Sequence, residues 1–286
     1  MEKEKVFLIL DSNAIIHRAF HALPNLSSKK GEPAGALYGF ILFFLKAIKD
    51  YSPEYIAAAF DLHAPTFRHK EYAHYKATRK KAPDELYSQI PKVKEFLKAA
   101  GVPVFEKEGY EADDIIGTIS SKTPSFAEAI IMTGDFDALQ LVNKNVKVFA
   151  LKRGIKEGVL FDEEKVKEKY SGLSPEELVD FKALRGDPSD NIPGVLGIGE
   201  KRAIELIKEF KNIENLHKSK KLAGKMEQAF LSKRLSEIKK DVPISFEIED
   251  CRFADKKEGI AEFLESQGFK SLLERVNKKR NITLWE

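Results

Sequence analysis

Three short apolar runs that each lead to an aspartate set the strongest limit on how this chain can fold. Residues 6–10, 55–60 and 129–133 are almost entirely apolar, which is typical of strands buried on both faces. Asp11 and Asp61 follow the first two runs directly, and Asp135 follows the third after one glycine. A weaker strand signal covers residues 146–150.

Helical periodicity fills the intervals between these runs. Residues 34–50, 85–100 and 111–122 are predicted helices. Strands that alternate with helices indicate βαβ units, hence an α/β fold with a mostly parallel central sheet and helices on both faces. Ligands of open α/β sheets bind beyond the carboxyl ends of the strands. We therefore expect the strand-end aspartates to meet in one crevice.

The pattern changes after about residue 170, where strand signals largely disappear. Ser174 and Pro175 followed by two glutamates predict a helix start, and this helix reaches about residue 184. Further helices are predicted at 200–210, 222–239, 256–266 and 269–279. We divide the chain into an α/β core (1–170) and a helical region (171–286).

Charge is unevenly distributed along the chain. Lysine and arginine number 48 and aspartate and glutamate 45, a net charge of +3. Residues 67–81 nevertheless contain six basic residues against one acid, and residues 217–240 contain eight against two. Two basic blocks in one chain favour a polyanionic partner.

Other features of composition limit the compartment. The longest apolar run, 35–45, has 11 residues, and a bilayer span needs about 20. The single cysteine, Cys251, excludes a disulfide framework and a Cys-rich metal site. These features predict a cytoplasmic protein without membrane contact.

Nine acids at strand ends, helix starts and turns form the main chemical signal. They are Asp11, Asp61, Glu111, Asp113, Asp114, Asp135, Asp137, Asp187 and Asp190. Like charges that meet in a crevice repel, and bound divalent cations relieve this. An all-oxygen set suits Mg²⁺ or Mn²⁺. Since the nine acids carry −9, the rest of the chain carries +12. A carboxylate crevice in a basic protein suits phosphodiester hydrolysis.

Several short motifs carry a family resemblance. They are Phe60-Asp61, Ala64-Pro-Thr-Phe-Arg-His69, Gly109-Tyr-Glu-Ala-Asp-Asp114, Thr133-Gly-Asp135 and Gly186-Asp187 with Ser189-Asp-Asn-Ile-Pro-Gly-Val195. In this order and spacing they resemble the 5′-nuclease domain of bacterial DNA polymerase I and its flap-endonuclease relatives, over nearly the whole chain.

The resemblance implies a PIN/5′-nuclease-like fold with two divalent metal ions. The first would be held mainly by Asp11, Asp61, Glu111, Asp113, Asp114 and Asp135, some of them through water. The second would be held by Asp137, Asp187 and Asp190, with Asp135 near both. Asp11 and Asp135 would thus be catalytic residues through the metals.

The resemblance also implies that residues 67–84 form a basic arch over the active site, through which a single strand passes. Lys76 and Arg79 would contact the scissile phosphate and offset the charge of the transition state. Tyr75 would stack on a base near the cut. Further expected DNA contacts are Arg18, Arg68 and Lys80.

A glycine-rich hairpin gives a second DNA signal. Gly194, Gly197 and Gly199 permit a turn with amides at a helix start, a phosphate site. Lys201 and Arg202 follow in the first helical turn, where the macrodipole disfavours cations, so a nearby anion would account for them. The resemblance identifies residues 186–210 as a helix-hairpin-helix that grips duplex DNA and holds a K⁺ ion.

The implied activity is that of a monomeric structure-specific 5′ nuclease that removes flaps and primers in replication and repair, near the nucleoid. Its partners would be flapped duplex DNA, a 5′ single strand, RNA primers, and a DNA polymerase in the same chain or a separate one. Three positions depart from the usual family pattern, namely His17, Phe136 and Arg202. None removes a metal ligand.

Two alternatives from other classes stay open. A PIN-like ribonuclease shares the strand-end acids but ordinarily lacks the hairpin and the basic arm. A non-catalytic DNA-binding module would have lost metal ligands, and all nine acids are present. A phosphotransferase of the haloacid dehalogenase type would need a second aspartate where Asn13 stands.

Overall fold

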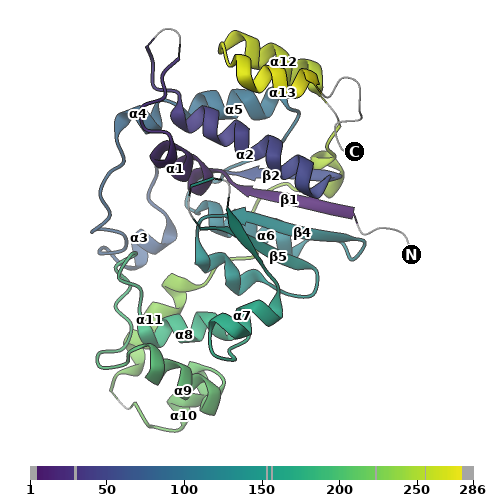
Figure 1. The fold of residues 1–286 in the computed structure, drawn as a ribbon. Coiled ribbons are helices and arrows are strands. Elements are labelled where there is room, and N and C mark those ends of the chain that lie inside the picture. The colour runs from purple at the N-terminus through teal and green to yellow at the C-terminus, as the bar shows by residue number, and fades with distance from the viewer. Residues whose placement is uncertain are drawn as a thin grey trace.

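A six-stranded sheet runs through the upper middle of the molecule (Figure 1). The computed structural model describes residues 5–28, 31–152, 154–155, 157–222, 224–254 and 256–278. The strands are β1 (Lys5–Asp11), β2 (Tyr55–Ala59), β3 (Val104–Phe105), β4 (Ala127–Thr133), β5 (Val146–Leu151) and β6 (Gly158–Phe161). Their order is β3-β2-β1-β4-β5-β6. All are parallel except β6, which is antiparallel to β5, so the predicted fold class is confirmed.

Both faces of the sheet are covered, as the continuous apolar runs require. Phe7 and Ile9 of β1 belong to one hydrophobic cluster, while Leu8 and Leu10 belong to the other. Helices α1 (Ser12–Ala22), α2 (Gly35–Tyr51) and α5 (Ile90–Ala99) contribute to the cluster of Leu8 and Leu10. Helix α6 (Ala112–Ser121) and the 3₁₀ helix η1 (Phe136–Leu141) cover the opposite face.

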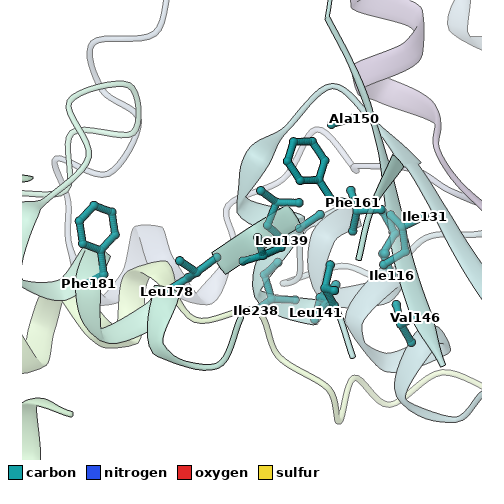
Figure 2. Close-up of a cluster of buried hydrophobic side chains, with 14 of the residues drawn as sticks. Ile116, Ile131, Leu139, Leu141, Val146, Ala150, Phe161, Leu178, Phe181 and Ile238 are labelled. Carbon is teal, nitrogen blue, oxygen red and sulfur yellow. The ribbon is translucent and has the colours of Figure 1, made fainter. Parts of the chain in front are cut away.

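The hydrophobic cluster that contains Phe7 and Ile9 extends beyond the sheet into the helical region. Figure 2 shows Ile131 of β4 and Leu139 of η1 in it, and Phe181 farther along. Helix α7 (Glu163–Lys169) leads into this region, whose first helices are α8 (Glu177–Arg185), α9 (Glu200–Phe210), α10 (Ile213–Lys218) and α11 (Met226–Ser236), in the lower part of Figure 1. One buried cluster therefore ties the helical region to the α/β core.

Two predicted helices differ from the observed ones. The helix expected at 222–239 is shorter, because the backbone N–H groups of Ile238 and Lys239 donate to Gln140 Oε1 and Asp114 Oδ1 instead of continuing α11. The helix expected at 85–100 is divided into α4 (Asp84–Tyr87) and α5.

The last part of the chain returns to the α/β core. After the 3₁₀ helix η2 (Ile248–Cys251), helices α12 (Lys257–Ser266) and α13 (Lys270–Lys278) pack over α5 and α2 at the top of Figure 1. The Phe263 ring lies 5.6 Å from that of Phe96. Residues 171–286 are thus not one separate body, and the predicted helix end at residue 279 lies outside the described residues. None of the described helices is both long and apolar enough to cross a bilayer.

Candidate active site

The carboxyl ends of β1, β2 and β4 open onto one crevice. Asp11 is the last residue of β1 and pairs in register with Ala59 of β2. On its other side β1 pairs with β4, and Leu10 is opposite Met132. The strand order changes direction between β1 and β4, the place where open α/β sheets bind ligands. The structure therefore brings the predicted strand-end acids Asp11, Asp61 and Asp135 together.

Asp11 is buried and also caps helix α1. Its Oδ1 accepts a hydrogen bond from the Ala14 N–H at 3.1 Å, and its Oδ2 accepts one from the Thr133 hydroxyl. Burial raises the pKa of Asp11 to about 7, against these two hydrogen bonds, and the charges of Asp61 and Asp135 raise it further. The Thr133 hydroxyl also accepts from the Asp135 N–H at 2.9 Å. Thr133, which the sequence analysis missed, thus ties the two acids together.

Asp113 lies in the first turn of α6 and faces the same crevice acids. Burial and the charges of Asp135 and Asp11 hold the pKa of Asp113 well above its usual value. Asp61 accepts the Ala112 N–H at 2.7 Å. None of the described cationic side chains forms an ion pair with Asp11 or Asp113. The charges of Lys76 and Arg79 act on Asp113 and Asp61 without outweighing burial, so the floor of the crevice is a group of crowded acids, two of which have no ion-pair partner among the described residues.

Asp114 and Arg68 form a buried structural pair instead of site groups. Arg68 Nη1 and Nη2 donate to the two Asp114 oxygens at 2.7 and 2.8 Å, and both side chains are almost wholly buried. Asp114 also accepts from the N–H groups of Glu111 and Lys239. These four donors already use the Asp114 oxygens, so a direct bond from Asp114 to a metal, as expected from the sequence, would require these contacts to break. Arg68 is unable to reach DNA.

The basic arm, which we define as residues 67–84, rests on acids from both predicted metal sets. After helix α3 (Phe67–Glu71) the chain forms turns without further helix up to α4. Lys76 Nζ donates to Glu111 Oε1 at 2.8 Å, and Arg79 pairs with Asp190. Lys76 has a left-handed backbone (φ 55°), held by a hydrogen bond from its N–H to the Asp190 carbonyl. The arm is therefore attached to the crevice by both backbone and charge.

Tyr75 lies beneath the arm and does not face solvent. It is only 3% exposed, and its hydroxyl donates to Glu111 at 3.1 Å and Asp190 at 3.3 Å. The expectation that Tyr75 stacks on a DNA base is wrong for this conformation. A cavity of about 540 Å³ lies between the arm and α1, lined by Asp61 and Arg79 among others.

Lys182 of α8 is a site residue that the sequence analysis missed. Its ammonium pairs with Asp137 and, at 2.6 Å, with Asp187. Burial raises the pKa of Asp137 to about 6 although Lys182 opposes this, whereas Lys182 and Ser189 outweigh burial and lower the pKa of Asp187 to about 2. A lysine five residues before Asp187 was the available signal.

The glycine hairpin between α8 and α9 is only partly available to DNA. Gly194 is buried with φ 63°, and its N–H donates to the Ser232 hydroxyl. A Cβ at Gly194 would lie 2.4 Å from the Gly186 nitrogen, so Gly194 serves close backbone packing and not phosphate contact. Gly197 and Gly199 are exposed, and Gly199 is the N-cap of α9.

The remaining predicted DNA contacts vary in availability. Lys80 and Lys201 are exposed, and Arg202, also exposed, pairs with Glu205 at 2.8 Å. Arg18 is partly buried and donates to the carbonyls of Lys152 and Gly134. Arg18 therefore fixes the loop that carries Asp135.

The carboxylate oxygens of the crevice are suitable ligands for divalent cations, although in this structure the acids do not converge on one metal position. Within the described part of the chain, no three acidic, histidine or cysteine side chains are positioned to hold one ion together. The reason is that Glu111, Asp190, Asp137 and Asp187 turn toward lysine and arginine partners. Asp11 and Asp113 have no such partner, and oxygen-only donors suit Mg²⁺ or Mn²⁺.

Comparisons with known proteins agree with this geometry. Residues 6–171 match the model of the 5′-3′ exonuclease N-terminal resolvase-like domain, and residues 173–259 match that of the 5′-3′ exonuclease C-terminal SAM fold. DNA polymerase I of Caldicellulosiruptor bescii is 42% identical over 94% of this chain and 33% of its own length. The chain thus spans about one third of the length of such relatives.

Solved structures share the fold. Bacteriophage T5 flap endonuclease, in a complex with DNA and metal ions, gives a TM-score of 0.66 at 20% identity, covering 96% of this chain and 97% of its own. Flap endonuclease-1 from Methanococcus jannaschii gives 0.62 at 21% identity, covering 98% and 92%.

Proposed function

Because the chain belongs to the 5′-3′ exonuclease family, we propose that it is a divalent-metal-dependent 5′ nuclease that cuts flapped DNA near the branch. The observation that carries this proposal is the crevice floor. Asp11 and Asp113 interact there with Asp135, and the charge of Lys76 offsets only part of the effect of burial and of the other acids on Asp113. This combination suits metal-assisted cleavage of a polyanion.

The chain's acids divide into two ligand sets for Mg²⁺ or Mn²⁺. The first set is Asp11, Asp61, Glu111, Asp113 and Asp135. The second set is Asp137, Asp187 and Asp190. When bound, the two ions supply Lewis-acid activation of water and charge stabilisation at the leaving 3′ oxygen, and the product carries a 5′ phosphate.

The basic residues then hold the substrate. Lys76 and Arg79 exchange their present partners Glu111 and Asp190 for the phosphate at the cut, and stabilise the charge that develops there. The arm passes over the 5′ single strand. Exposed Lys80 and the Arg18 guanidinium contact further phosphates.

The duplex rests on the hairpin. The amides of Gly197 and Gly199 lie at the start of α9, where a phosphate is favoured, with Lys201 and Arg202 beside them. A K⁺ ion at the hairpin and a monomeric state remain part of the proposal. So do action on RNA primers, a cytoplasmic location near the nucleoid, and a DNA polymerase as partner, in the same chain or separate.

The test is cleavage of a 5′-flap DNA labelled at its 3′ end, in Mg²⁺, Mn²⁺ or EDTA. We expect cutting at the branch with either metal, none in EDTA, and a loss of at least about 100-fold in Asp135→Asn, because removing an electrostatic group of a site costs about 10²–10³ in rate. Asp50→Asn is the control, since Asp50 is exposed at the end of α2, just before the start of β2 and so away from the carboxyl ends of the strands.

Other outcomes point to the alternatives. Tight binding of flap DNA without any cleavage in either metal would contradict the nuclease and favour a DNA-binding module. Cutting confined to single-stranded RNA would favour the PIN-like ribonuclease.

A further inference from the structure

An aromatic pocket opens from the crevice on the side of α7 and α8. It has a volume of about 370 Å³, within the roughly 300–1,000 Å³ of small-ligand sites. Asp135 and Asp187 line one part of it, and Phe136, Tyr170, Lys169 and Arg185 line another. The pocket therefore lies between the crevice and the glycine hairpin, which follows Arg185 directly.

Phe136 is the exposed wall of this pocket. It stands between Asp135 and Asp137 as the first residue of η1, and it is 37% exposed. Its ring meets the Phe161 ring edge-on, with centroids 6.0 Å apart at 86°, so the ring is held in place. More than a third of this large apolar side chain is left exposed at the wall of the pocket, so part of its ring surface is available to a ligand.

Two cations stand beside the rings, and one of them, Lys169, is not paired with an acid in the described part of the chain. The Lys169 ammonium lies 4.5 Å from the Phe136 centroid and 5.5 Å from that of Tyr170. No ion pair among the described residues involves Lys169. Arg185 lies over the Phe181 ring at 5.4 Å, with Glu200 at 3.8 Å. Aromatic rings with a cation that has no acidic partner are the chemistry that takes up a nucleotide, with stacking for the base and charge for the phosphate.

We propose that this pocket binds the nucleobase exposed at the branch point, stacked on Phe136. Lys169 leaves the ring and pairs with the phosphate of the same nucleotide. The base at a branch has one face without a stacking neighbour, and Phe136 supplies that neighbour at the point where the strand leaves the crevice for the hairpin. This inference rests on the proposed function, and it makes Phe136 a residue that recognises the junction.

The test measures DNA binding in EDTA by fluorescence anisotropy, so that no cleavage is needed. The variants are Phe136→Ala and Phe136→Leu, the second of which keeps apolar packing on Phe161. Phe126→Ala is the matched control, because Phe126 is also exposed (48%) and has Lys5 over its ring at 5.5 Å. Phe126 directly precedes the first residue of β4, at the end of the strand opposite to Asp135. The substrates are an intact flap DNA and versions with one abasic nucleotide at each position within three of the branch.

We expect both Phe136 variants to bind intact flap DNA about 5- to 150-fold more weakly than the unchanged protein, the range for loss of one base–aromatic stack. At one position, an abasic nucleotide should lower the DNA affinity of the unchanged protein by a similar factor. The same abasic nucleotide should lower the affinity of the Phe136 variants by no more than about 2-fold, because two changes that remove the same contact do not add. Phe126→Ala should bind normally.

Binding of both Phe136 variants within about 2-fold of the unchanged protein, or losses that add fully at every abasic position, would overturn the proposal. Cleavage of intact flap DNA by the unchanged protein in Mg²⁺ is measured in parallel. If that cleavage occurs while the Phe136 variants bind normally, only the pocket is refuted; if it does not occur, the proposed function fails.

Discussion

Replacing Asp114 by asparagine separates the structural acids of the site from the metal-binding ones. Asp114 is fully buried and accepts four hydrogen bonds, from Arg68 Nη1 and Nη2 and from the N–H groups of Glu111 and Lys239. Asp114→Asn keeps the shape of the side chain but removes the main counter-charge of Arg68, and breaking a buried pair costs about 3–5 kcal/mol.

A second contact of Arg68 indicates where in this range the loss of stability in Asp114→Asn falls. Glu111 Oε2 lies 3.4 Å from Arg68 Nη1 and partly compensates the guanidinium, so we expect the low end, about 3 kcal/mol. For a chain of this size, that corresponds to a fall in melting temperature of roughly 6–12 °C. Mn²⁺ affinity should change little, because the Asp114 oxygens are buried and already accept four hydrogen bonds.

The assay pairs urea unfolding with calorimetric titration of Mn²⁺, for Asp114→Asn and for Asp113→Asn. Asp113→Asn should show the reverse pattern, with stability kept or raised in the absence of metal and Mn²⁺ affinity lowered at least about 10-fold, a change of about 1.4 kcal/mol. Reduced Mn²⁺ affinity in Asp114→Asn, together with unchanged stability, would refute the reasoning and return Asp114 to the ligand set.

Three more outcomes follow from the structure. In EDTA the stability should fall as pH rises from about 4 to about 7, because the pKa of Asp11 is raised to about 7 on folding and the folded state binds the extra proton in that window; melting curves against pH should be flatter in Asp11→Asn, and equal slopes would contradict this. Lys182→Met should bind a second Mn²⁺ several-fold more tightly, since it removes a competing cation, and weaker binding by calorimetry would contradict it. Gly194→Ala should abolish or severely reduce folding, whereas Gly197→Ala, with φ 86° but open space around it, should cost about 1 kcal/mol, as circular dichroism melting can check.

The local hydrophobic pattern of the sequence was sufficient to predict the central strands of the sheet. The runs at 6–10, 55–60 and 129–133 became β1, β2 and β4, because a strand buried on both faces needs continuous apolar sequence. The short edge strands β3 and β6 were missed, since two to four residues carry little periodicity. Helix α1 was also missed, because Asp11 was interpreted only as a ligand while it also serves as the N-cap.

Partner choice within the site could not be derived from the sequence. Arg68 and Tyr75 lie in a basic, aromatic stretch that is typical of nucleic-acid contact, yet both are buried on Glu111. Their burial depends on α6 and α11 docking against the arm, which is a long-range contact. Lys182 was unrecognised for the same reason, because its role depends on Asp137, 45 residues away along the chain.

On the proposed function, the ion pairs of the crevice couple metal binding to DNA binding. Lys76, Arg79 and Lys182 now neutralise acids that belong to the proposed ligand sets. A divalent cation that takes these acids leaves the three basic side chains without partners, at the place where a phosphate would enter. Each ligand then favours the other by the same free energy, since linkage is reciprocal. A crevice whose acids and bases exchange partners in this way can remain folded without metal and still offer positive charge to DNA once the metal is bound.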